Sequence, residues 1–118
     1  MKKKNRIRKN EEFQKLIRTG TKLSNQSFVM YKAEKKEGEA RIGISLSKKI
    51  GNAVQRNLIK RQVRMMCQDL IDFEKCGFDA VIIVRFAYKD GSFEINKNIL
   101  EKLFIKAKMI ELHIKESL

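Results

Sequence analysis

Residues 40–64 read ARIGISLSKKIGNAVQRNLIKRQVR, and the spacing of the apolar side chains changes partway along this stretch. Residues 40–47 alternate strictly between apolar side chains and polar or glycine positions, which predicts a half-buried strand. From about Asn52 to Phe73 the apolar side chains recur at helical spacing, which predicts a long helix. The stretch therefore predicts a strand that leads, through Gly51, into a long amphipathic helix.

This helix is expected to have an apolar face and a cationic face. On a helical wheel with about 100° per residue, the apolar side chains of one face fall within about 60° of one another: Ile59, Val63, Met66 and Leu70. An opposite arc of roughly 140° holds basic and amide side chains, with uncharged Ala53 and Gln68 among them: Arg56, Asn57, Lys60, Arg61 and Arg64. No Asp or Glu occurs between Arg41 and Gln68, so no acidic neighbour in the sequence offsets these charges.

An unmixed cationic face has two interpretations. It can be a solvated surface, although like charges one turn apart destabilise an isolated helix by roughly 0.2–0.5 kcal/mol each, and residues 94–116 of the same chain mix both signs. It can also bind phosphates, since arginine holds two phosphate oxygens at once and phosphate binding releases counterions. Lys48 and Lys49 would extend that surface to the helix N-terminus, and Asn52 and Asn57 could donate hydrogen bonds to sugar or base edges.

The whole chain has the size and charge of a single nucleic-acid-binding domain. Its 118 residues suit one domain, and 27 basic against 14 acidic residues give a formal net charge of +13. Such an excess indicates a polyanionic partner, either a nucleic acid or an anionic membrane surface. The longest apolar run is too short to cross a bilayer. The two cysteines fit neither a zinc site nor a disulfide framework, which favours a cytoplasmic location.

Three strands are expected, at residues 27–33, 40–47 and 79–86. The first two are expected to pair antiparallel across a short polar turn. The third is a nearly continuous apolar run, which is typical of a central strand covered on both faces. With the helices, the predicted order is α-β-β-α-β-α, an α+β sandwich built on one small sheet.

The two ends of the chain predict a basic segment and two further helices. Residues 2–9 hold six Lys or Arg and no acid, so residues 1–9 are either a frayed, solvated tail or an arm that binds a partner. A helix is expected with Asn10 as its N-cap and Gly20, in a left-handed conformation, at its end. Another amphipathic helix is expected from about Glu94 through Ile114.

Five segments together resemble the bacterial ribonuclease P protein subunit. The most specific is the run SKKIGNAVQRN-x-IKR-x-x-R within residues 47–64. The matching segments are NEEFQKLIRTGT (10–21), SFVMY (27–31), RIGISLSKKIGNA (41–53), IGNAVQRNLIKRQVR (50–64) and VIIVR (81–85). The resemblance covers nearly the whole chain, and it implies three helices on a four-stranded sheet with a left-handed βαβ crossover.

The resemblance implies an RNA-binding subunit of a ribonucleoprotein endonuclease. In that family the catalyst is the RNA, which uses Mg²⁺ to hydrolyse one phosphodiester and release the 5′ leader of precursor tRNA. The protein binds that RNA through its basic helix and binds the leader in a cleft between the first helix and the sheet. The implied partners are therefore the catalytic RNA and precursor tRNA, with no membrane and no obligate protein partner. Mg²⁺ is expected mainly on the RNA.

The resemblance also assigns roles to residues of this chain. The positions expected to face the catalytic RNA and nearby substrate are Lys48, Lys49, Asn52, Arg56, Asn57, Lys60, Arg61 and Arg64. The positions expected to line the leader cleft are Phe13, Ile17, Val29 and Tyr31. The chain departs from the family pattern at Leu58, where many relatives have a third basic residue, and at Ile17, where an aromatic is frequent. It also departs at residues 86–87, where relatives often have a proline.

The residues alone leave other functions open. The chain could be a different RNA-binding protein, such as a ribosomal protein on a similar α+β fold. It could be a DNA-binding regulator that uses residues 53–71 as a recognition helix, although no short helix and turn precede that segment. A role at a membrane surface conflicts with the need for the opposite helix face in the core. Phe13 and Tyr31 could equally be core residues rather than a pair that stacks on bases.

Overall fold

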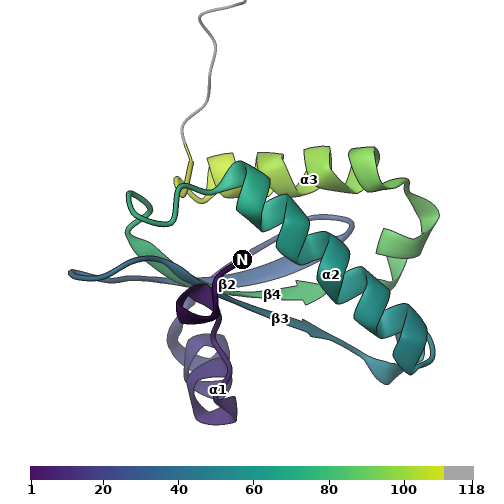
Figure 1. Ribbon diagram of the computed structural model, residues 1–118, viewed down its shortest axis with the longest axis horizontal. Helices are drawn as coiled ribbons and strands as arrows, with labels where there is room; N and C mark the ends of the chain where they lie inside the picture. Colours follow the sequence, from purple (N-terminus) through teal and green to yellow (C-terminus); the bar gives the residue numbers. More distant parts are fainter. Residues whose placement is uncertain (111–118) are drawn as a thin grey trace, which may run out of the picture.

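The alternating stretch forms a strand and the stretch after it a long helix, as expected, in the computed structural model, which describes residues 1–110 (Figure 1). Strand β3 is Arg41–Leu46 and helix α2 is Ala53–Leu70, joined by the short 3-10 helix η2 at Lys48–Ile50. The other elements are η1 (Lys3–Asn5), α1 (Asn10–Thr19), β1 (Thr21–Ser24), β2 (Phe28–Glu34), β4 (Phe78–Val84), η3 (Phe86–Asp90) and α3 (Phe93–Lys106). The three helices and the fourth strand, β1, are those that the family resemblance implied.

The four strands form one mixed sheet in the order β1-β2-β4-β3. Strand β2 pairs antiparallel with β1 and with β4, whereas β3 pairs parallel with β4. The prediction that residues 27–33 pair with residues 40–47 is therefore wrong, because β4 lies between them. Strand β4 suits the central place, since Ala80, Val81 and Ile82 are all fully buried, on both faces of the sheet.

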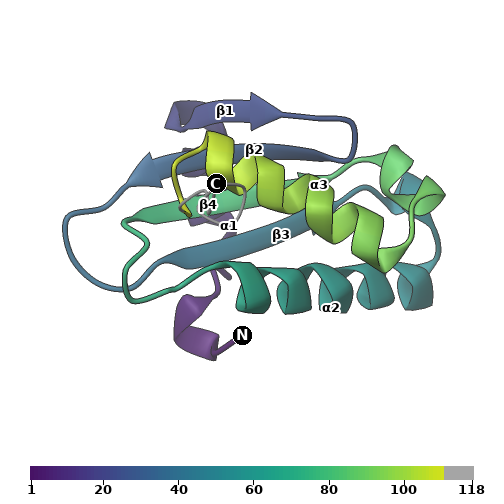
Figure 2. The same ribbon diagram turned by 90° about the horizontal axis from the view of Figure 1, so that it is seen from above.

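Helices cover both faces of the sheet, in unequal numbers. Helices α2 and α3 lie side by side on one face, and α1 lies on the other (Figures 1 and 2). The main core fills the space between the sheet and the helix pair, and its largest fully buried side chains include Phe28, Met30, Ile42, Val63, Met66, Ile82, Leu100 and Phe104. Because β3 and β4 are parallel, the chain must cross over the sheet between them, and α2 is that crossover.

Helix α1 packs on a second, smaller core. Its Leu16 is buried with Val81 of β4 and with Ile7, and Phe13 and Ile17 pack against this cluster. The ring of Phe13 lies directly over Gly43 of β3, where an added Cβ would stand 2.6 Å from the ring atom Cζ. The glycine therefore permits the close approach of α1 to the sheet.

An ion-pair network connects the first helix to two neighbouring strands. The guanidinium of Arg41 on β3 donates to both Asp79 of β4, at 2.9 Å, and Glu12 of α1, at 2.7 Å. Asp79 also accepts from the backbone N–H of Arg41 and from Lys35 Nζ, each at 3.0 Å. These carboxylates raise the pKa of Arg41 above its ordinary value, with Asp79 the larger cause.

The N-terminal segment is folded onto the sheet, so the interpretation of residues 1–9 as a frayed tail is wrong. The backbone N–H of Ile7 donates to the carbonyl of Ile42 at 3.1 Å, beside a parallel bridge between Arg6 and Ile42. Asn5 is 3% exposed and Ile7 is 4% exposed, and Asn5 Nδ2 donates to the Ala40 carbonyl at 3.0 Å. The segment therefore extends the edge of the sheet beyond β3.

Four predicted helix boundaries change. Helix α2 ends at Leu70, before the predicted end at Phe73. Lys9 is the N-cap of α1 and makes no side-chain capping bond, while Asn10 is the first helical residue. Gly20 has a φ of −76° and ψ of 163°, so the helix ends in extended rather than left-handed backbone. Helix α3 ends at Lys106 and residues 107–110 form turns and bends, so the prediction of helix there is wrong; the rest of the predicted continuation, 111–114, lies outside the described residues.

Replacing Gly43 with alanine is expected to destabilise the fold. The new Cβ would meet the Phe13 ring, and overpacking of this kind lowers the free energy of unfolding by about 1–3 kcal/mol. Gly77→Ala is the matched control, because the nearest atom to its Cβ would be 3.9 Å away, and that change should be neutral or stabilise by up to about 1 kcal/mol. Urea unfolding measures both. Equal stability of the two variants would contradict the close approach of α1.

Candidate nucleic-acid interface

The cationic residues of α2 occupy the side of the helix opposite its core face, as the wheel predicted. Arg56, Lys60 and Arg64 follow one another at intervals of one turn and are half-buried, while Asn57 and Arg61 beside them are exposed. This stripe runs above the outer edge of β3, where Arg64 shares a small hollow with Ile42 and Ile44 of that strand. Half-burial keeps the stems of the long side chains packed, so the charged groups are held in a row.

The reverse side of α2 anchors the helix. Ile59, Val63, Met66 and Cys67 are buried against the sheet and α3. Burial raises the pKa of the Cys67 thiol to about 12, so at neutral pH this side chain is an uncharged part of the core. Rotation of the helix to hide the cations would expose this apolar row, so packing fixes the direction in which the cations point.

The N-terminus of α2 is capped by side chains. Asn52 Oδ1 accepts from the Gln55 backbone N–H at 2.9 Å, and Gln55 Oε1 accepts from the Asn52 N–H at 2.9 Å, which together form a capping box. Capping thus uses the Asn52 oxygen and leaves its amide group to donate elsewhere. Arg56 Nη1 donates to the Gly51 carbonyl at 2.9 Å. The first turn contains no acid, so the positive end of the helix dipole adds to the charge of the two exposed lysines of η2.

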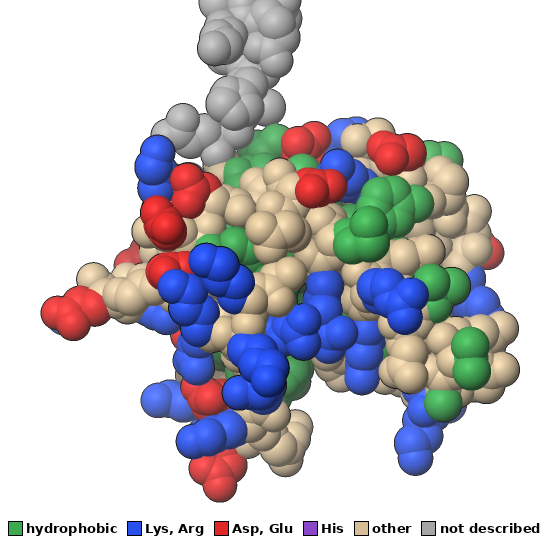
Figure 3. Space-filling model, viewed as in Figure 1, with side chains coloured by type: hydrophobic (Ala, Val, Ile, Leu, Met, Phe, Trp, Pro, Cys, Tyr) green, Lys and Arg blue, Asp and Glu red, His purple; other side chains and the backbone are tan. Residues whose placement is uncertain are grey.

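No ion pair neutralises this surface within residues 1–110. The ion pairs found there involve other basic residues: Lys4, Lys35, Arg41, Lys75 and Lys97. Figure 3 shows the consequence, a band of Lys and Arg side chains across this face, with Asp and Glu gathered mainly above it. The eight predicted interface positions from Lys48 to Arg64 therefore lie on one continuous, uncompensated surface.

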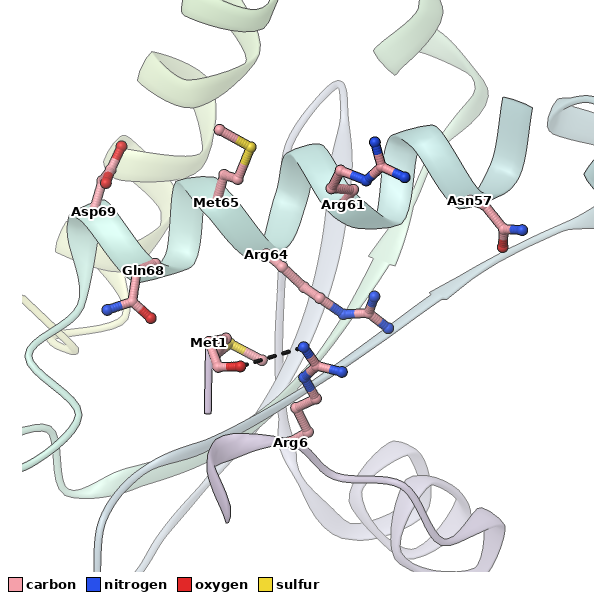
Figure 4. A pocket seen from close by; sticks show the side chains of 8 residues that line it. All are labelled: Met1, Arg6, Asn57, Arg61, Arg64, Met65, Gln68 and Asp69. Carbon is pink, nitrogen blue, oxygen red and sulfur yellow. Dashed lines mark hydrogen bonds between the residues drawn. The ribbon is translucent and has the colours of Figure 1, made fainter. Parts of the chain in front are cut away.

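A groove joins this surface to the N-terminal segment. It has a volume of about 560 Å³ and is lined by Met1, Arg6, Asn57, Arg61, Arg64, Met65, Gln68 and Asp69. Arg6 Nη2 donates to the Met1 carbonyl at 3.2 Å, which holds the guanidinium beside that of Arg64 (Figure 4). The helical pattern of the sequence could not reveal Arg6, because its position depends on how the N-terminal segment folds back onto β3.

Arg6 and Arg64 form an unfavourable pair in the free protein. Burial lowers the pKa of the Arg64 guanidinium below its ordinary value, and the charge of Arg6 lowers it further. The one carboxylate in the groove, Asp69, is already paired with Lys97 of α3 at 3.0 Å. An anion between the two guanidiniums would relieve their repulsion.

The four residues predicted to line a leader cleft share the α1 side of the sheet. Phe13 and Ile17 project from α1, while Val29 and Tyr31 lie on β2 opposite Ile83 and Val81 of β4. All four are partly exposed. Figure 3 shows the molecule hollowed at its lower edge, beside α1. The interpretation of Tyr31 as a fully buried core residue is thus wrong, and its ring has an accessible surface.

Two further features bear on the chemistry of the site. Within residues 1–110 no three His, Cys, Asp or Glu side chains cluster as metal ligands would. In the same part of the chain, no helix combines the length and apolar content needed to span a bilayer.

Comparison with known proteins identifies the family. The family model described as Ribonuclease P matches residues 1–108. The chain belongs to the ribonuclease P protein family. The ribonuclease P protein component of Bacillus velezensis is 46% identical over 110 residues, which span 92% of this chain and 94% of that protein.

Solved structures of ribonuclease P proteins have the same architecture. The chain superposes on the Staphylococcus aureus RNase P protein with a TM-score of 0.79 and 37% identity, covering 91% of this chain and 98% of that one. For the Thermotoga maritima RNase P protein the TM-score is 0.70 and the identity 28%, over 83% and 94% of the two chains. The three helices and four strands are therefore those of the family.

Replacing Arg64 with glutamine is expected to stabilise the free protein slightly at low salt. Glutamine keeps part of the aliphatic stem and removes the repulsion from Arg6, so the free energy of unfolding should rise by roughly 0.2–0.5 kcal/mol. The gain should disappear in about 1 M salt, where charges are screened within about 3 Å. Urea unfolding at both salt concentrations tests this.

Lys102→Gln, on the exposed side of α3, is the control for the general effect of lowering the net charge. The rise in its free energy of unfolding at low salt should be smaller than that of Arg64→Gln. A loss of stability in Arg64→Gln at low salt would show that Arg64 is not under strain from like charge.

Proposed function

We propose that this protein is the RNA-binding subunit of ribonuclease P, which binds the catalytic RNA and the 5′ leader of precursor tRNA. The observation that carries the proposal is the cationic stripe of α2, held outward by the core and free of ion pairs among the described residues. Membership of the ribonuclease P family supports the choice of RNA over DNA as the polyanion.

The cationic stripe of α2 and the polar residues beside it would bind the phosphates of the RNA backbone. Arginine side chains can each hold two phosphate oxygens, and their regular spacing on one helix suits the repeated charges of a polynucleotide. The side chains assigned to this contact are Lys48, Lys49, Asn52, Arg56, Asn57, Lys60, Arg61 and Arg64. Arg6 joins them through the groove that it shares with Arg64.

The catalytic centre is assigned to the RNA. In this proposal Mg²⁺ on the RNA supports hydrolysis of the phosphodiester that links the leader to the mature tRNA. The described part of the protein has no cluster of ligands that fits the ion, so no protein residue is given a role in holding it. The protein acts by positioning RNA, in a cytoplasmic particle, and takes part in no bond making or breaking.

The α1 side of the sheet would hold the single-stranded leader. Tyr31 offers a partly exposed ring on which a base can stack, and Phe13, Ile17 and Val29 provide an apolar surface around it. Sequence-tolerant stacking suits a leader whose bases differ from one precursor to the next.

Replacing Lys60 with alanine should weaken binding to the catalytic RNA and lower its salt dependence. Each phosphate contact contributes roughly 0.7–0.9 to the slope of log K against log salt, so the loss of one contact should reduce the slope by about one unit or slightly less. Filter binding across a range of salt concentrations measures the change. Arg56→Ala and Arg64→Ala should behave alike.

Lys102→Ala is the matched control, because it removes the same charge from exposed helix surface outside the stripe. An equal loss of affinity in Lys60→Ala and Lys102→Ala would show that only net charge matters. The enzymatic assignment is tested by cleavage assays at physiological Mg²⁺. The wild-type protein and the RNA together should cleave precursor tRNA, and the wild-type protein alone should not.

Replacing Tyr31 with alanine should weaken the binding of precursor tRNA more than the binding of mature tRNA. The loss of one stacked base costs about 1–3 kcal/mol, and mature tRNA has no leader to lose. Affinities of the reconstituted enzyme for both RNAs give the comparison, and Tyr31→Phe, which keeps the ring, should retain wild-type affinity. A leader role for this face would be refuted by equal losses for precursor and mature tRNA.

A further inference from the structure

A basic cluster with an aromatic ring lies at one end of the sheet, and it shares Lys48 and Lys49 with the surface described above. Because β3 and β4 are parallel, their carboxyl ends meet at the same edge of the sheet. Lys48 and Lys49 follow β3, and Arg85 and Phe86 follow β4, and all four side chains are exposed. The two short 3-10 helices that carry them, η2 and η3, pack against each other.

Phe86 is the exposed aromatic ring of this cluster. Its side chain is 60% exposed, whereas every other Phe and Tyr of residues 1–110 is buried or half-buried. The ammonium of Lys89 lies 5.2 Å from the ring centroid, and Asp90 is the one carboxylate of η3. Exposure of a large aromatic ring to water is unfavourable, so the ring is suited to binding a partner. The nearby cations favour a ligand that carries both negative charge and an aromatic ring over an apolar protein surface.

The backbone that carries Phe86 is held firmly. Tyr88, two residues on, is 4% exposed. Its hydroxyl donates to Gln62 Oε1 of α2 at 2.8 Å, and its ring meets Phe28 edge-on with centroids 5.8 Å apart. Burial raises the pKa of Tyr88 to about 12, so the hydroxyl remains a donor at neutral pH. Asn96 Nδ2 of α3 donates to the Tyr88 carbonyl at 2.8 Å.

The residue before Phe86 is fixed as well. The backbone N–H of Arg85 donates to the Ser27 carbonyl at 2.8 Å, and its guanidinium donates to the Asn25 carbonyl at 2.9 Å. Phe86 therefore stands between two anchored residues. Because the backbone on both sides of Phe86 is fixed, little backbone freedom is lost when a base stacks on its ring, which favours binding.

We propose that Phe86, with Lys48, Lys49 and Arg85 at the same edge of the sheet, is a stacking site for one unpaired nucleobase of RNA. The ring supplies the stacking surface and the three cations hold the adjoining phosphates. The inference rests on the proposed function, since it names an additional contact for the same RNA partners. The unpaired base comes either from the precursor leader or from the catalytic RNA.

The test uses enzyme reconstituted from the full chain and the catalytic RNA. Phe86→Ala should lower affinity for the RNA that supplies the base by about 5- to 150-fold, the range that corresponds to one stacked base. Phe86→Trp should keep the affinity, and Phe86→Leu, which is apolar but not aromatic, should lose it. The salt dependence should not change, because no charge is removed.

Three binding measurements separate the sources of the base. A defect with precursor tRNA alone, absent with mature tRNA and with the catalytic RNA, assigns the base to the leader. A defect in binding the catalytic RNA assigns it there. In either case, one abasic substitution in that RNA should weaken binding by the wild-type protein but not binding by Phe86→Ala. The position of that substitution identifies the stacked nucleotide.

Ile95→Ala is the control, because it shortens another exposed apolar side chain, 54% exposed on α3. If Phe86→Ala matches Ile95→Ala in every measurement while Lys60→Ala still weakens RNA binding, the stacking site is refuted and the proposed function stands. If Lys60→Ala also binds as the wild type does, the proposed function fails, and the inference with it.

Discussion

The parallel pairing of β3 with β4 is the constraint on which the rest of the structure depends. Two parallel neighbours need a crossover, and the crossover is α2. Once one side of α2 is packed on the sheet through Val63 and Met66, the 3.6-residue period fixes which residues face outward. The same pairing brings the ends of both strands to one edge, where η2 and η3 pack against each other although they are far apart in sequence.

Repulsion between like charges on α2 destabilises the free protein, and a polyanionic partner would remove this repulsion. A row of unpaired cations on one helix is destabilising, and the fold adds to it by bringing Arg6 beside Arg64. Arg41, by contrast, is paired with both Glu12 and Asp79. The contrast indicates that imbalance on the α2 surface serves binding, since a polyanion neutralises it and releases counterions.

Local patterns predicted the parts of the fold that local physics determines. The two faces of α2 and the buried central strand β4 followed from spacing alone, because side-chain direction has a fixed period in each structure. Long-range features did not follow. Strand β1 is short and exposed, the insertion of β4 between β2 and β3 is a matter of topology, and Arg6 reaches the interface only through tertiary contacts. Ile95 fits the apolar period of α3, yet it is exposed while Asn96 is buried and bonded to the Tyr88 carbonyl.

Lysine acetylation, read by mass spectrometry with and without the catalytic RNA, shows whether RNA covers the cationic surface of α2. We expect Lys48, Lys49 and Lys60 to become unreactive when RNA binds, because their ammonium groups are then covered by phosphates. Lys102 and Lys106 on α3 should react equally in both states, since they lie on the opposite helix of the pair. Protection of the α3 lysines with no change at Lys48, Lys49 and Lys60 would contradict this expectation.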